Sequence, residues 1–132
     1  MERTAVNPWD WSLAFGFNQG EIIQGQSRTL VCAGQTSVDA TGAPQHAGDM
    51  AAQVGLALDN LEAVLAGAGM TLANIVRLNF YTTDVDAFVA SSSDVLGPRL
   101  GAAGAMPPGT LLGVARLAYP ELMIEMEATA AD

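Results

Sequence analysis

The sequence predicts an α+β domain in which one sheet carries two helices on the same face. The hydrophobic period changes along the chain from two residues, typical of strands, to nearly four, typical of a helix, and back again. The predicted elements follow in the order strands, helix, strand, helix, two strands, with no linker, repeat or low-complexity segment between them. A length of 132 residues suits one core, so we expect residues 1–132 to form a single domain.

Two strands and a turn are predicted first. The segment FNQGEIIQG, from Phe17 to Gly25, has the character of a short strand with turn residues at both ends. The segment RTLVCAGQTSV, from Arg28 to Val38, is rich in residues that favour strands. The segment DATGAP, which begins at Asp39, has the composition of a turn.

A helix is predicted after this turn. Its apolar residues recur at spacings of four, four, three and four and therefore share one helical face: Met50, Val54, Leu58, Leu61 and Leu65. Asp49 stands at the N-cap position, where a short polar side chain accepts a backbone hydrogen bond. Gly67 or Gly69 is expected to end the helix.

The next two elements are a strand and a weaker helix. Alternation in NIVRLNFYTTD directs Val76, Leu78 and Phe80 to one side of the strand and Arg77, Asn79 and Tyr81 to the other. The segment DVDAFVASSSDVLGPRLGAAG then predicts a second helix. Asp84 or Asp86 stands near its start, and Pro98 is expected to kink it.

Two final strands are predicted, from about Thr110 to Leu117 and from Leu122 to Thr129. In the last strand, Glu125 and Glu127 share a side, and the apolar residues Ile124 and Met126 share the opposite one. If helices cover the apolar side, both carboxylates lie on the helix-free face. That face is either solvated or, in an oligomer, an interface that partly desolvates a carboxylate and suits it to proton transfer.

The charge composition indicates self-association and excludes several partners. Only 14% of the residues are charged, against about 25% in ordinary globular chains. A buried oligomer interface explains this shortage, and a mild surface rich in Ala and Gly is the alternative. The net charge of −9 and the five scattered arginines argue against nucleic acid and against anionic membrane surfaces. The chain has no Lys, so no side-chain amine can form a Schiff base.

The sequence gives no sign of a metal, a cofactor or a secretory signal. Cys32 is the only cysteine and is expected to be a small buried apolar residue. His46 is the only histidine, so one chain cannot build the usual multi-ligand zinc site, and no nucleophile elbow accompanies it. The start of the chain is polar and contains two Trp residues, unlike a signal peptide, and we expect a cytoplasmic location.

Several segments, in order, resemble the Rid family, which is also called YjgF-like and, in older naming, L-PSP endoribonuclease. The resemblance covers about Ala14 to Ala128. FGFNQG resembles the family's N-terminal aromatic segment, VCAGQTSVDATG its SGQ strand and turn, and VARLAYPELMIEMEA its C-terminal signature. The helix and strand between them also match the family pattern. Each segment alone is weak evidence, but the order and spacing of all of them are specific.

The resemblance implies a fold like that of chorismate mutase and a homotrimer whose three sheets form a barrel-like centre with the helices outside. It also implies clefts between subunits that hold small metabolites. The best-known branch of the family hydrolyses reactive enamines and imines, such as 2-aminoacrylate, to 2-keto acids and ammonia. No nucleic acid, membrane or cofactor is expected as a partner.

The resemblance also implies which residues line the cleft. Glu125 matches the carboxylate that holds the attacking water and is the expected catalytic residue. The expected substrate-binding positions are Phe17, Ala33, Gly34, Ser92, Gly109 and Thr110. Phe17 stands where the family usually has Tyr, so its hydroxyl is absent.

Gly109 stands where the deaminase branch has an Arg that clamps the substrate carboxylate. Losing such a charge-assisted contact costs on the order of 2–5 kcal/mol. We therefore expect weak or no turnover of 2-aminoacrylate, a more apolar cleft, and a gain of activity in Gly109→Arg. The chain resembles an Arg-less branch of the family, and the roles of Arg28, Arg77 and Arg116 stay open.

Three functions remain open at this point. The first is hydrolysis of another imine, enamine or related compound, and the second is binding of a small metabolite without catalysis. The third is the ribonuclease or translation-inhibitor activity that family names suggest, which the acidic charge disfavours.

Overall fold

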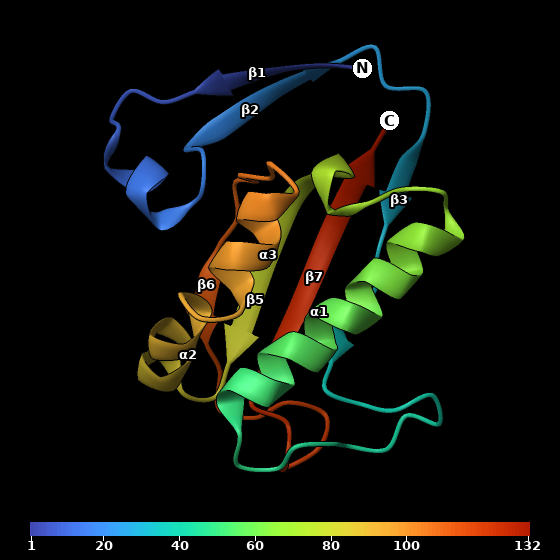
Figure 1. Cartoon of the computed structure of the whole chain (residues 1–132), viewed down its shortest axis with the longest axis vertical. Coiled ribbons are helices and arrows are strands. Elements are labelled where there is room, and N and C mark those ends of the chain that lie inside the picture. The colour runs from blue at the N-terminus through green and yellow to red at the C-terminus, as the bar shows by residue number, and fades with distance from the viewer.

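Five strands form one sheet in the computed structural model, which describes residues 1–132 (Figure 1). The strand order is β3-β7-β5-β6, and β4 also pairs with β7. The strands are β3 (Thr29–Val31), β4 (Gln35–Thr36), β5 (Ile75–Thr82), β6 (Leu111–Gly113) and β7 (Ile124–Ala131). All pairs are antiparallel except β5 with β6, which run parallel. The predicted α+β class is confirmed.

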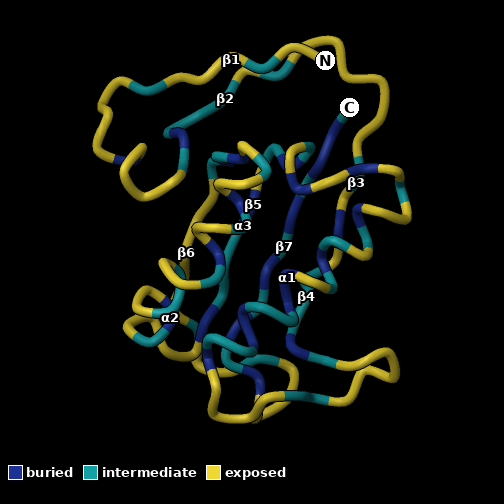
Figure 2. The backbone as a smooth tube through the Cα atoms, viewed as in Figure 1, coloured by how far each residue is buried: buried dark blue, intermediate teal, exposed yellow.

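The long helix α1 (Met50–Gly67) covers one face of the sheet and supplies much of the core. Its predicted apolar residues are buried, and Val54, Leu58, Leu61 and Leu65 are completely so. Asp49 caps the helix, because its Oδ1 accepts a hydrogen bond of 3.0 Å from the amide of Ala52. Figure 2 shows buried residues concentrated along β7 and the inner side of α1. None of the helices combines the length and the apolar composition needed to cross a membrane.

The predicted second helix is two helices, α2 (Val85–Ser92) and α3 (Leu96–Ala102). Asp84 is the N-cap of α2, since its side chain accepts a hydrogen bond from the amide of Ala87. Pro98 does not kink a continuous helix, because it lies in the first turn of α3. A missing N–H is tolerated there, since the first-turn amides have no partner within the helix.

A bulge changes the predicted alternation at the start of β5. The pairing with β7 shifts between Ile75 and Arg77, so Ile75 is fully buried and Val76 is only half-buried. An extra residue in one strand reverses the side to which the preceding residues point. The expectation that Val76 shares the core side with Leu78 was therefore wrong.

The last strand confirms the predicted division into two faces. Ile124 and Met126 are completely buried under the helices, while Glu125 and Glu127 lie half-buried on the helix-free face. The preceding strand is much shorter than predicted. Its pairing ends at Gly113, and residues 114–123 form a loop that leads to β7.

An N-terminal arm lies outside the five-stranded sheet, where a single sheet was predicted. It consists of β1 (Glu2–Val6), the 3₁₀ helix η1 (Trp11–Phe15) and β2 (Gly20–Gln24), and its two strands pair with each other. Arg3 fastens the arm to the body by donating to the carbonyl oxygen of Ile75 at 2.8 Å. Figure 1 shows the hairpin running across one end of the body.

Candidate functional site

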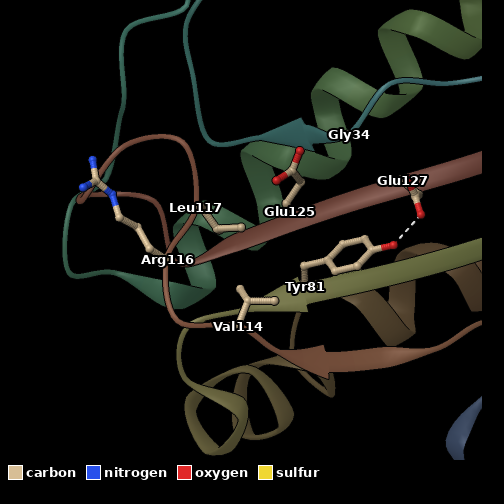
Figure 3. A pocket seen from close by; sticks show the side chains of 7 residues that line it. All are labelled: Gly34, Tyr81, Val114, Arg116, Leu117, Glu125 and Glu127. Atoms are coloured by element: carbon tan, nitrogen blue, oxygen red, sulfur yellow. Dashed lines mark hydrogen bonds between the residues drawn. The ribbon is translucent and has the colours of Figure 1, made fainter.

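A pocket of about 280 Å³ opens on the helix-free face of the sheet around Glu125 (Figure 3). We call it the Glu125 pocket. It is lined by residues from β5, β7, the approach to β4 and the loop after β6: Gly34, Tyr81, Val114, Arg116, Leu117, Glu125 and Glu127. Four separate segments meet here because β7 pairs with both β4 and β5.

Gly34 makes room for the carboxylate of Glu125. A Cβ atom at position 34 would lie 2.0 Å from the Glu125 Oε1 atom, so the carboxylate occupies the space that any other residue would fill. The register explains the contact, because Thr36 of β4 pairs with Glu125 and Gly34 lies just before that strand. The predicted proximity of Glu125 and Gly34 is thus found. The Glu125 carboxylate has no hydrogen-bond partner within the chain and is free to bind a ligand or water.

Glu127 differs because its carboxylate is held by two neighbours. Tyr81 donates its hydroxyl hydrogen at 2.5 Å and Asn79 donates from Nδ2 at 3.1 Å, both to Oε1. These hydrogen bonds, led by that of Tyr81, hold the pKa of Glu127 below its ordinary value. The same contact raises the pKa of the Tyr81 phenol. Glu127 therefore serves to position Tyr81, and Glu125 is the unengaged acid of the pair.

A second, larger pocket of about 810 Å³ lies between η1, the helices α2 and α3, and the strands β5 and β6. We call it the apolar pocket. Aromatic side chains line it, among them Trp11, Phe17, Phe80 and Phe88. The Trp11 and Phe17 rings meet edge to face at 5.8 Å. No lining residue carries an ionisable side chain.

The predicted site residues divide between the two pockets. Gly34 and Glu125 line the Glu125 pocket, whereas the apolar pocket contains Phe17, Ser92, Gly109 and Thr110. Ala33 lines neither pocket and is exposed, and its carbonyl oxygen accepts a hydrogen bond of 3.2 Å from the Gln35 side chain.

The two pockets lie on opposite faces of the sheet. Phe80 lines the apolar pocket, and the next residue of β5, Tyr81, lines the Glu125 pocket. Successive side chains of a strand point to opposite faces. Within one chain, Glu125 and Phe17 therefore do not share a pocket, and the expectation that they meet in a cleft between subunits stays a prediction.

Gly109 packs against the backbone of β5 too closely for any side chain. A Cβ atom at this position would lie 1.7 Å from the carbonyl oxygen of Leu78. The close approach is held by hydrogen bonds on both sides, from the Leu78 amide to Pro108 and from the Phe80 amide to Thr110. Gly109→Arg was expected to raise activity if the geometry were otherwise preserved, and that condition is not met, because the new side chain would collide with this strand.

Three of the five arginines are engaged in ion pairs within the chain. Arg3 pairs with Glu21, Arg28 with Asp132, and Arg99 with both Asp59 and Glu62. These contacts give Arg3, Arg28 and Arg99 a structural role.

Arg77 and Arg116 form no ion pair within the chain. Arg116 lines the Glu125 pocket, but Figure 3 shows its guanidinium group turned away from the Glu125 carboxylate.

Sequence reasoning missed Tyr81 and Arg116 as pocket residues. The predicted alternation of β5 placed Tyr81 on the helix-free face, but only the register, in which Tyr81 pairs with Glu125, places them together. Arg116 was expected in a strand, whereas it lies in the loop after β6.

The fold and the two pockets define a protein of the Rid type, and comparisons agree. The sequence profile of the family described as Endoribonuclease L-PSP matches residues 14–132, and the chain belongs to this family. The mitochondrial protein mmf2 of Schizosaccharomyces pombe is 32% identical over 91 residues, which cover 68% of each chain. The structure of YyfB from Yersinia pestis, a Rid protein of unknown function, shares 37% identity over 99% of both chains with a TM-score of 0.86. The structure of E. coli TdcF with bound serine shares 26% identity, covering 97% of this chain and 91% of the other, with a TM-score of 0.70.

Proposed function

We propose that three copies of this chain assemble into a ring in which the Glu125 pocket of one subunit and the apolar pocket of its neighbour form one cleft. The observation that carries this proposal is the division of the family's site residues between opposite faces of one sheet. A single chain cannot bring the two sets together, whereas head-to-tail contacts around a threefold axis can. The helix-free face, on which Val31 is 78% exposed, is the expected interface.

The cleft binds a small metabolite and hydrolyses an imine or enamine other than 2-aminoacrylate. The serine bound to TdcF supports a small-molecule site in this family. Glu125 is the proposed catalytic residue because its carboxylate is unengaged, while that of Glu127 is held by Tyr81. The absence of a clamp at Gly109 argues for another substrate than 2-aminoacrylate.

The proposed reaction needs only water and one carboxylate. The water oxygen bonds to the imine carbon as its proton passes to Glu125, and the electron pair of the C=N bond moves to nitrogen, which takes that proton back from Glu125. In the resulting carbinolamine, Glu125 removes the hydroxyl proton and passes it to nitrogen. The oxygen electron pair forms the carbonyl group as the C–N bond breaks, and ammonia leaves. General acid–base assistance of this kind contributes about 10²–10⁴-fold.

The test is ammonia release from imines generated freshly in solution, measured for the wild type, Glu125→Gln and Glu127→Gln. We expect Glu125→Gln to abolish the acceleration because Gln cannot accept the proton, although it keeps the shape. Glu127→Gln should retain most activity, because its amide oxygen can still accept from Tyr81. Equal losses in both variants would contradict the assignment of Glu125.

A non-catalytic trimer that binds a metabolite is the second candidate. It is favoured by the lack of any fixed cation in the apolar pocket to orient a carboxylate substrate. Ligand binding without ammonia release from any imine would support it. In either case we propose a cytoplasmic protein whose partners are copies of itself and a small molecule, not nucleic acid or membrane.

A further inference from the structure

We infer that the cleft selects an uncharged ligand with a flat, apolar body and disfavours ligands that carry a carboxylate. This inference rests on the cleft of the proposed function and specifies which ligands enter that cleft. It includes imines and carbonyl compounds derived from simple amines, as opposed to those derived from amino acids.

The apolar pocket has the size and lining for such a ligand. Its volume of about 810 Å³ falls in the range of roughly 300–1,000 Å³ found for small-molecule sites. Its lining is mostly hydrophobic, and its polar side-chain groups are the hydroxyls of Ser92, Ser93 and Thr110 and the indole N–H of Trp11. Hydroxyl groups can orient a neutral carbonyl or imine nitrogen, but they cannot neutralise a buried carboxylate.

Aromatic rings from separate elements form the walls. Trp11 and Phe17 come from the N-terminal arm, and Phe80 and Phe88 come from β5 and α2. The Phe80 and Phe88 rings lie 5.2 Å apart. Rings that approach from several sides favour a flat, apolar ligand, because aromatic pairs gain energy beyond the area they bury.

The apolar pocket contains no cation that could bind a carboxylate ligand. At Gly109, the position of the family's clamp Arg, a cationic side chain is also sterically excluded. The Leu78 carbonyl oxygen fills the space beside Gly109. Three of the five arginines are engaged in ion pairs elsewhere. The Glu125 pocket, which completes the proposed cleft, contributes two carboxylates, and these repel a third.

Among the residues that line the two pockets, Arg116 is the one cation, so it could oppose this inference. Its guanidinium group is turned away from Glu125 in Figure 3. A carboxylate ligand would require this group to swing inward, and Arg116→Gln removes it.

The binding test uses two probes of equal shape, 3-phenylpropanamide and 3-phenylpropanoate, titrated into the wild-type protein in a calorimeter at neutral pH. The two differ essentially in charge, because an amide is nearly isosteric with a carboxylate. We expect the amide to bind about tenfold more tightly or better, since a carboxylate without a cationic partner is penalised on burial. Equal or tighter binding of the carboxylate would overturn the inference, and so would binding of neither probe, as when a neighbouring subunit fills the pocket.

A positive charge placed in the apolar pocket should reverse the preference for the amide probe over the carboxylate probe. Ser92→Arg introduces a guanidinium group beside the aromatic walls, and we expect it to bind the carboxylate probe more tightly than the amide. Ala63→Arg adds the same charge on the exposed side of α1 and should keep the wild-type preference. An unchanged preference in Ser92→Arg would show that the probes bind outside the apolar pocket and would overturn the inference. If the wild type prefers the carboxylate and Arg116→Gln abolishes this preference, Arg116 is the clamp and the inference fails.

A second measurement separates this inference from the proposed function. An amine oxidase acting on benzylamine generates an uncharged imine, and an amino-acid oxidase acting on phenylalanine generates an imine with a carboxylate. Ammonia release accelerated only for the uncharged imine supports both proposals. Acceleration only for the charged imine keeps the function and overturns the ligand class. Tight amide binding without any acceleration keeps the ligand class and overturns the catalysis.

Discussion

The carbonyl oxygen of Leu78 lies only 1.7 Å from the point at which a side chain at position 109 would begin. Gly109→Ala should therefore destabilise the protein by roughly 3 kcal/mol, because the strand contact must open to admit even one methyl group. Denaturant unfolding measures this change. A variant that unfolds like the wild type would show that the segment before β6 can move freely away from β5.

Gly67→Ala is the matched control. Gly67 ends α1, and a Cβ atom there would meet nothing within 4 Å. The substitution should change the free energy of unfolding by no more than about 1 kcal/mol, in the stabilising direction, since Ala is the better helix former. The contrast isolates the steric effect at position 109 from the general effect of replacing glycine.

Gly34→Ala should displace the Glu125 carboxylate without unfolding the chain. The new methyl group would lie 2.0 Å from the Oε1 atom, but that atom ends a flexible side chain that can turn aside. We expect ligand binding or ammonia release to fall by about tenfold or more, because the proposed catalytic carboxylate would lose its geometry. The thermal unfolding temperature should stay close to that of the wild type. Unchanged function would mean that the position of Glu125 is unimportant.

The proposed trimer predicts a specific weak point at Val31. This side chain is 78% exposed in the single chain, and it pairs with Thr129 near the end of the central strand β7. Sedimentation should find roughly three chains per particle for the wild type and single chains for Val31→Asp, because a buried unpaired carboxylate destabilises an interface. Ala63→Asp, on the exposed side of α1, should remain trimeric. A monomeric wild type would contradict the proposed cleft.

The hydrogen bond between Tyr81 and Glu127 predicts how stability depends on acid. The pKa of Glu127 is lowered from its ordinary value of 4.5 in the folded protein, chiefly by the Tyr81 hydroxyl. Its contribution to stability is therefore present above pH 4.5 and is lost as the pH falls through the lowered pKa. Unfolding midpoints measured from about pH 6 to about pH 3 should decline less steeply in Tyr81→Phe than in the wild type.

Tyr119→Phe is the control for this pH dependence. Tyr119 is 49% exposed and lies in the loop before β7. Its replacement should leave the decline of the unfolding midpoint between about pH 6 and about pH 3 as steep as in the wild type. Equally steep declines in the wild type and Tyr81→Phe would show that the phenol does not lower the pKa of Glu127.

The sequence alone determined the elements whose hydrophobic period is long and regular. The face of α1 from Val54 to Leu65, the caps Asp49 and Asp84, and the placement of Glu125 and Glu127 on one side of β7 were all predictable. Periodicity and capping are local properties, so a single segment contains all the information they need. The order and spacing of the segments were also sufficient to identify the resemblance to the Rid family.

Only the tertiary structure decided which of these residues meet. The bulge in β5, the pairing of Tyr81 with Glu125 and the contact of Gly109 with Leu78 depend on register between strands far apart in the chain. No local pattern encodes the register, and a shift of one residue moves a side chain to the opposite face of the sheet. For this reason Phe17 and Glu125, placed together by resemblance, lie on opposite faces of one subunit, and the sequence could not reveal that Gly109 admits no side chain.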